Sequence, residues 1–130
     1  MATTDEIRAA KQKIADAKAK DVKASFDYYA TDGEMYLFGE IGPEDEGGVD
    51  ALMVGKALKK IGNRPVTAYI DSVGGSVDTG ISIFNALEAH RAGVTTIISS
   101  LAASIASVIF QAGQKRIALS NSMMMVHSPL

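Results

Sequence analysis

Ser104 is the residue of this sequence whose surroundings best suit nucleophilic chemistry. It follows a β-branched run, Val94 to Ile98, and precedes an apolar segment long enough for a buried helix, so it is predicted at a strand-to-helix turn. The unpaired N–H groups and positive dipole end of that helix suit a developing oxyanion, and the hydroxyl could attack a carbonyl there. Small residues before an apolar helix also serve close packing alone, and the pattern by itself does not separate these two interpretations.

Two other segments carry residue types that could complete such a site. Gly74 and Gly75 follow a predicted strand and open the next helix, so the backbone can approach a ligand and direct N–H groups at one point. A plain structural turn is the alternative. The pair lacks the Lys-Ser/Thr of a phosphate-binding loop and the third glycine of a dinucleotide fingerprint, which argues against nucleotide binding. His127 lies at a predicted strand end, where an imidazole is either a base or a hydrogen-bonded structural residue.

Strands and helices that alternate along the chain would position these residues. The patterns predict a helix after Ser104, helices at residues 3–23, 49–61 and 78–92, and strands at residues 25–30, 35–38, 66–71, 94–98, 114–119 and 123–126. Residues 31–34 are predicted to be a turn between the first two strands. This order indicates an α/β core of stacked β-β-α units whose loops gather at the strand ends.

The first predicted helix forms an N-terminal arm with a weak apolar face. Thr3 and Glu6 have the spacing of a capping box, and the modest apolar stripe consists of Ile7, Ala10 and Ile14. We expect either a solvated arm or an arm that docks on a neighbouring subunit.

Three further features have ordinary structural interpretations. The lysines of the helix at residues 49–61 are expected on its solvent side. His90, near a helix end, is expected at the surface without a chemical role. The consecutive methionines 123–125 are expected to fill an apolar core.

Composition excludes several functional classes. The chain has 130 residues, 47% of them hydrophobic, which is enough for one domain with a moderate core. A formal charge of −2 and few aromatic residues argue against a nucleic-acid partner. The sequence contains no cysteine, which excludes disulfides and is compatible with a reducing cytoplasm. No apolar run reaches the length of a membrane span and the N-terminus is not signal-like, so we expect a soluble, cytoplasmic protein without a membrane partner.

Three blocks of this sequence, in their order and spacing, closely resemble the Clp protease proteolytic subunit family. The blocks are Tyr69–Val77, Ala102–Ser107, and Asn121-Ser122 with Met125–Leu130. Ser104 follows Gly75 by 29 positions, as the family leads us to expect, and His127 follows Ser104 by 23, slightly fewer than in the bacterial housekeeping enzyme. The resemblance covers about residues 35–130. The N-terminal arm and residues 37–41 are more similar to the phage and prophage branch, the head maturation proteases.

The resemblance implies a fold and a set of site residues. The fold would be an α/β, ClpP/crotonase-like spiral of β-β-α units in a single domain, with a helical arm at residues 1–24 and a protease core at residues 25–130. The activity would be that of an ATP-independent serine endopeptidase without cofactor or metal. The implied roles are Ser104 as nucleophile, His127 as general base, the N–H groups of Gly75 and Ile105 as oxyanion hole, and Gly74, Ser76 and Val77 along a substrate bound as an added strand.

The resemblance also implies partners and exposes one departure. The partners would be a polypeptide substrate, further copies of the chain in a ring, and phage capsid or portal proteins for the head maturation branch. The family's third triad member is an acid beyond the histidine, and no residue of this sequence aligns with it. Asp71 and Asp78 lie near the glycine turn, but their spacing directs neither at His127. We therefore expect a C-terminally incomplete core with weak or no activity.

Three alternatives stay open on the sequence alone. The first alternative is a non-catalytic assembly subunit or pseudoprotease. The second is an acyl-CoA enzyme of the crotonase type, whose related fold also uses backbone N–H groups as an oxyanion hole. Within the protease class, Lys115 could replace the histidine in a Ser-Lys dyad.

Overall fold

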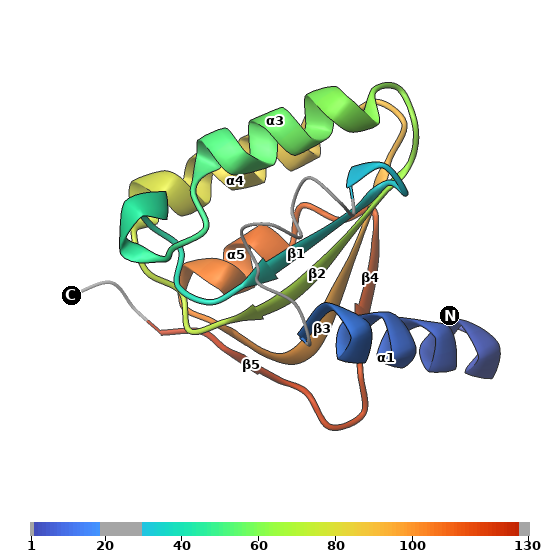
Figure 1. Cartoon of the computed structure of the whole chain (residues 1–130). Coiled ribbons are helices and arrows are strands. Elements are labelled where there is room, and N and C mark those ends of the chain that lie inside the picture. Colours follow the sequence, from blue (N-terminus) through green and yellow to red (C-terminus); the bar gives the residue numbers. More distant parts are fainter. Residues whose placement is uncertain (1, 19–29, 128–130) are drawn as a thin grey trace.

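A parallel β-sheet with helices on both of its faces organises the chain (Figure 1). The computed structural model describes residues 2–18 and 30–127. In chain order the elements are α1 (Thr4–Lys18), β1 (Glu34–Phe38), the 3₁₀ turn η1 (Glu44–Glu46), α3 (Ala51–Ile61), β2 (Val66–Ser72), α4 (Val77–Glu88), β3 (Val94–Ala103), α5 (Ile105–Phe110), β4 (Lys115–Ala118) and β5 (Met123–Met125).

The ten-residue strand β3 is the centre of this sheet. The strand order is β1-β2-β3-β4, every pairing is parallel, and β5 also pairs with β3. β4 pairs with residues 95–98, whereas β5 pairs with residues 101–103 further along the same edge. β3 is therefore longer than the expected strand at residues 94–98, and its extra length holds β5.

Side chains of the strands alternate between two apolar layers, as a pleated strand requires. One layer lies under α3, α4 and α5, which cover the same face of the sheet (Figure 1). Its strand residues are Met35, Leu37, Val66, Ala68, Ile70, Val94, Ile98 and Ala102. The intervening residues Tyr36, Phe38, Tyr69 and Ile97 point to the other face. All five residues of β1 are buried because both faces are covered there.

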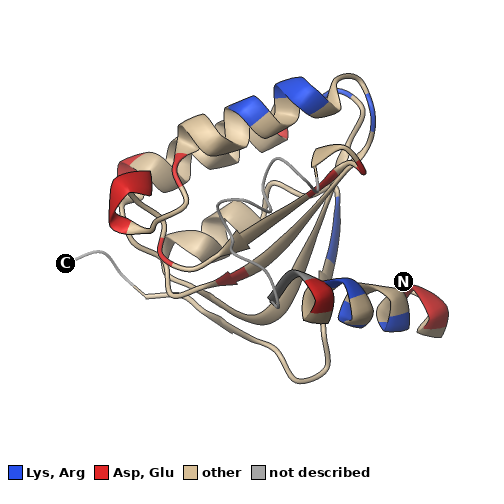
Figure 2. Cartoon of the chain, viewed as in Figure 1, with Lys and Arg blue, Asp and Glu red and all other residues tan. Residues whose placement is uncertain are grey.

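α3 forms where the sequence predicted a helix with one apolar side. The carboxylate of Asp50 accepts the N–H of Met53 at 2.8 Å and caps the first turn. Val54, Ala57 and Ile61 face the core. The lysines of this helix, Lys56, Lys59 and Lys60, are exposed, as expected. They account for the blue segments of α3 in Figure 2.

α4 and α5 approach each other closely because Gly80 has no side chain. A Cβ atom at Gly80 would overlap the side chain of Ile105, the first residue of α5. At the other end of α5, the Thr96 hydroxyl donates to the carbonyl of Phe110 at 2.7 Å and ties the helix to β3.

Among the described residues, no helix is both long and apolar enough to cross a membrane.

α1 packs on this chain's own sheet, so the expectation of a solvated arm is wrong, whereas docking on a neighbouring subunit stays a prediction. The capping box is confirmed, because the Glu6 N–H donates to the Thr3 hydroxyl at 3.1 Å and the Thr3 N–H donates to the Glu6 carboxylate at 3.3 Å. Ala10 and Ile14 are buried in the second apolar layer. The weak stripe suffices because the sheet offers large aromatic side chains as its partner.

Two ion pairs hold α1 at the sheet. Lys13 pairs with the buried Glu34 of β1 at 2.6 Å, and Lys115 of β4 pairs with Glu6 at 2.8 Å. The ring of Tyr69 stacks on Tyr36 with centroids 4.7 Å apart. Burial, assisted by the negative charge of Glu34, raises the pKa of Tyr69 well above its usual range.

The structure corrects two further expectations. Ala30, expected in a strand, is helical, while residues 19–29, which include most of that strand and the end of the first predicted helix, lie outside the described residues. Met123, Met124 and Met125 are 64%, 47% and 49% exposed and do not fill a core. They are exposed because β5 is a short strand at the sheet edge, and the helices of the described chain do not extend over it (Figure 1).

The contact of Gly80 with Ile105 predicts opposite outcomes for two helical glycines. Gly80→Ala should lower the free energy of unfolding by about 1–3 kcal/mol because Ile105 must move. Gly55→Ala in α3, where nothing lies within 4 Å of the added atom, should raise it by about 0.5–1 kcal/mol. Urea unfolding followed by circular dichroism measures both, and equal stability of Gly80→Ala and the parent chain would contradict this packing.

The ion pair between Glu6 and Lys115 predicts a pH-dependent stability. The Lys115 hydrogen bond holds the pKa of Glu6 below its usual 4.5, so the stabilisation is present at neutral pH and is lost as pH falls through the lowered value. Melting temperatures of the parent chain should exceed those of Glu6→Gln at pH 7, and the difference should vanish in acid.

Lys115→Gln should behave in the same way as Glu6→Gln, and the double variant should show no further loss. Glutamine at position 6 retains the capping box, so that contact cancels in the comparison. A difference in melting temperature that persists far below pH 4.5 would show that the ionised pair is not its cause.

Candidate functional site

Ser104 lies between the last residue of β3 and the first residue of α5, in a strained backbone conformation. Its φ of 55° and ψ of −127° make it the one non-glycine residue with positive φ in the described part of the chain. Such a conformation costs about 1–3 kcal/mol and persists only where neighbouring structure imposes it. The predicted strand-to-helix turn at Ser104 is therefore confirmed and is sharper than a simple junction.

Backbone contacts on both sides hold this turn in place. The N–H of Ser104 donates to the carbonyl of Met125 at 2.9 Å, continuing the pairing of β3 with β5. The carbonyl of Ser104 accepts two bonds from Ser107, one from the backbone N–H at 3.0 Å and one from the hydroxyl at 2.6 Å. Both peptide groups that flank Ser104 are thus fixed.

The same strand pairing brings His127 to Ser104. Because Ala103 lies opposite Met125, the residues after β5 continue alongside the turn. Ser104 and His127 line one pocket of about 240 Å³. The other lining residues are Val77, Ile105, Ser107, Val108 and Val126, so the walls are mainly aliphatic.

The glycine turn after β2 packs directly against Ser104. Gly74 has a φ of 97°, and a Cβ atom there would lie 2.8 Å from the carbonyl oxygen of Ala103 and 2.9 Å from Cβ of Ser104. The same atom would lie 3.3 Å from the backbone nitrogen of Ile105. Only glycine meets both the conformation and the space at this position.

The direction of the Gly75 N–H follows from the contacts of its neighbours. Ile41, in the segment after β1, donates to the carbonyl of Gly74 at 2.8 Å and accepts the N–H of Ser76 at 2.8 Å. In this parallel bridge, Gly75 directs its own N–H away from Ile41. Since β2 lies between β1 and β3, that direction is toward the side on which Ser104 follows β3.

The expected site residues lie at one edge of the sheet, but the members of the expected substrate segment make different contacts there. The Gly74 N–H donates to the Ser72 hydroxyl at 3.0 Å, and the Ser76 hydroxyl caps α4 by accepting the N–H of Thr79 at 3.3 Å. Of the three residues of the expected substrate segment, Gly74, Ser76 and Val77, it is Val77 that lines the pocket.

The charged residues considered from the sequence do not line the pocket. Asp71 accepts a hydrogen bond from the Ser100 hydroxyl at 2.7 Å, and Asp78 is exposed in the first turn of α4. Among the described lining residues none is Asp or Glu. Lys115 pairs with Glu6 beside Thr95, about 30 Å along β3 from Ser104, which removes the Ser-Lys dyad.

Three residues that line the pocket were not predicted from the sequence to belong to the site: Ser107, Val108 and Val126. Ser107 and Val108 follow Ser104 by about one helical turn, and this spacing was the available signal for the serine. Val126 depends on the pairing of β5, which sequence patterns do not give.

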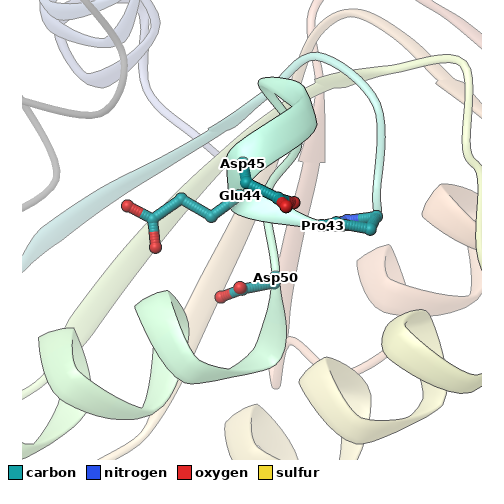
Figure 3. A pocket seen from close by; sticks show the side chains of 4 residues that line it. All are labelled: Pro43, Glu44, Asp45 and Asp50. Atoms are coloured by element: carbon teal, nitrogen blue, oxygen red, sulfur yellow. The ribbon is translucent and has the colours of Figure 1, made fainter.

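A second hollow, of about 490 Å³, lies beside η1 and carries acidic side chains (Figure 3). Glu44 and Asp45 extend in different directions, while Asp50 caps α3 (Figure 3). Across residues 2–18 and 30–127, no group of three or more His, Cys, Asp or Glu is arranged to hold a metal ion. We assign this hollow no chemistry.

The fold and the pocket define an α/β protein with a serine in a strained turn at the carboxyl ends of parallel strands, where such folds place their sites. Comparison with known families identifies the group: the family model described as Clp protease matches residues 19–130. The chain belongs to the Clp protease family. The α/β fold expected from the resemblance is confirmed.

Individual relatives agree with this assignment. The chain is 45% identical over 69 residues to an ATP-dependent Clp protease proteolytic subunit of Ligilactobacillus salivarius, covering 52% of this chain and 35% of the relative. It is 36% identical over 102 residues to subunit 3 of Synechococcus sp. strain CC9605, covering 75% and 50%. The solved structure of ClpP1 from Listeria monocytogenes superposes with a TM-score of 0.69 at 27% identity, covering 78% of this chain and 60% of that one. The chain thus spans half or less of the length of these two curated relatives.

Proposed function

We propose that the chain carries the nucleophile and base of a serine endopeptidase of the Clp type. The observation that carries the proposal is that Ser104, held in a strained turn, and His127 line one pocket beside a glycine turn. Family membership adds support, because the relatives named above are proteolytic subunits.

In this mechanism Ser104 and His127 share the proton transfers. The Ser104 oxygen adds to the scissile carbonyl carbon as His127 takes the hydroxyl proton. The tetrahedral intermediate then breaks its C–N bond, and His127 returns the proton to the departing amine. Water adds to the resulting acyl ester with His127 again as base, which releases the carboxylic acid and restores the Ser104 hydroxyl.

Backbone N–H groups stabilise the charge that develops on the carbonyl oxygen. The N–H of Gly75 is directed toward the side of Ser104, and the backbone nitrogen of Ile105 lies beside the glycine turn. Two such donors, fixed before the substrate binds, are worth about 10²–10³ in rate each where one has been removed from comparable sites. We assign the oxyanion hole to this pair.

The aliphatic walls of the pocket set the kind of substrate that fits. An apolar side chain next to the scissile bond of an extended polypeptide fits these walls, which consist of Val77, Ile105, Val108 and Val126.

The chemistry itself needs no nucleotide, which is the sense in which we propose an ATP-independent core. Phage head proteins remain the proposed substrates only under the head maturation branch, which rests on the arm and on residues 37–41.

A non-catalytic assembly subunit is the second candidate. One observation favours it: the described residues that line the pocket include no Asp or Glu. Removal of the acid from a related triad costs about four orders of magnitude in rate, so low reactivity alone does not separate the two candidates. The presence of both a serine and a histidine in the pocket argues against an acyl-CoA enzyme.

Reaction with a fluorophosphonate tests the nucleophile directly. We expect the 130-residue chain to gain one adduct at Ser104, with loss of fluoride, as detected by intact-mass spectrometry. Ser104→Ala should gain none, and His127→Ala should react at least 100-fold more slowly because the base is lost.

Ser122→Ala is the matched control, because Ser122 is also a half-buried serine but lies outside the pocket. It should gain the adduct at the parental rate. Absence of any adduct on the folded parent chain would favour the assembly subunit.

Exposed apolar side chains support the proposal that copies of the chain associate into a ring. Leu52, Val73 and Ile81 are 61%, 65% and 45% exposed, in addition to the methionines of β5. Light scattering after size-exclusion chromatography should therefore give a mass several times that of one chain. A monomer at high protein concentration would contradict this.

A further inference from the structure

Ser107 makes a contact with Ser104 that neither packing nor helix formation requires. Its hydroxyl donates to the Ser104 carbonyl at 2.6 Å, although the backbone N–H of the same residue already donates to that oxygen at 3.0 Å. Ser107 is 4% exposed, and its side chain lines the pocket. One carbonyl thus receives two hydrogen bonds from one residue, at the strained turn.

That carbonyl belongs to the peptide group whose N–H is the Ile105 donor. Rotation of this peptide is the ψ angle of Ser104, which is −127° in a residue whose φ is already 55°. A bond that fixes the carbonyl therefore fixes the direction of the N–H on the other side of the same peptide plane. Donation to the carbonyl also polarises the peptide and makes its N–H a stronger donor, because linked hydrogen bonds reinforce one another.

We propose that Ser107 is a positioning residue for the oxyanion hole, acting through the peptide between Ser104 and Ile105. The inference rests on the proposed function, since it assigns the Ile105 N–H to the developing oxyanion. Ser107 touches neither the scissile bond nor the proton in transfer. It holds the donor at the correct angle and raises its strength before the substrate arrives.

A set of substitutions separates this role from packing. Ser107→Ala removes the hydroxyl and retains a good helix former. Ser107→Cys has nearly the same shape but a weak donor, and Ser107→Thr keeps a hydroxyl that can reach the carbonyl three residues earlier in a helix. Ser122→Ala is the control, because the Ser122 hydroxyl also donates to a carbonyl three residues earlier, that of Leu119, at the same 2.6 Å.

The first readout is the second-order rate of fluorophosphonate labelling at Ser104. We expect Ser107→Ala to label about five- to tenfold more slowly, Ser107→Cys to lie between it and the parent, and Ser107→Thr to stay within about twofold of the parent. Ser122→Ala should label at the parental rate even if it loses stability in urea. A parental rate in Ser107→Ala, or a Ser107→Cys variant as fast as the parent, would overturn the proposal.

The second readout does not require a reactive serine. In Ser104→Ala, the amide ¹⁵N resonance of Ile105 reports donation to the preceding carbonyl. It should shift upfield when Ser107→Ala is added and stay in place when Ser122→Ala is added. An unchanged resonance in the Ser107 variant would overturn the inference, whereas no labelling of the parent chain together with the expected shift would contradict the proposed function alone.

Discussion

The pairing of β3 with strands on both of its edges is the constraint on which the rest of the site depends. Parallel strands end at the same edge of a sheet, so the segments after β1, β2 and β3 meet there. β5 then pairs with the last residues of β3 and holds the Ser104 backbone through the Met125 carbonyl. The strained turn persists because this pairing determines the direction of the chain before Ser104 while the packing of α5 determines it afterwards.

Two glycines allow close packing around Ser104 because they have no side chains. Gly74 allows the turn after β2 to touch Ser104, and Gly80 allows α4 to approach the first residue of α5. Ile105 is in contact with both regions, since its nitrogen lies beside Gly74 and its side chain lies against Gly80. Helix packing, the glycine turn and the backbone donor are therefore parts of one arrangement, in which a change in one place displaces the others.

α1 has a different task, on the opposite face of the sheet. Its apolar stripe is weak, yet it buries Ala10 and Ile14 against the stacked rings of Tyr36 and Tyr69. Coverage on this side allows β1 to be buried on both faces, as strands of parallel sheets usually are. The ion pairs at Glu34 and Glu6 orient the helix across the strands, while the aromatic layer supplies the apolar contact.

The sequence by itself determined most elements, because periodicity, caps and glycine turns depend on residues a few positions apart. It also singled out Ser104, the glycine turn and His127, whose roles stay predictions until they are tested. Tertiary structure alone decided that α1 covers its own sheet, that β4 and β5 share one edge of β3, and that Met123–Met125 are exposed. It also separated Lys115 from Ser104 and placed Ser107 in the pocket. The physical reason is that pairing and packing join segments tens of residues apart, whose energies no local pattern contains.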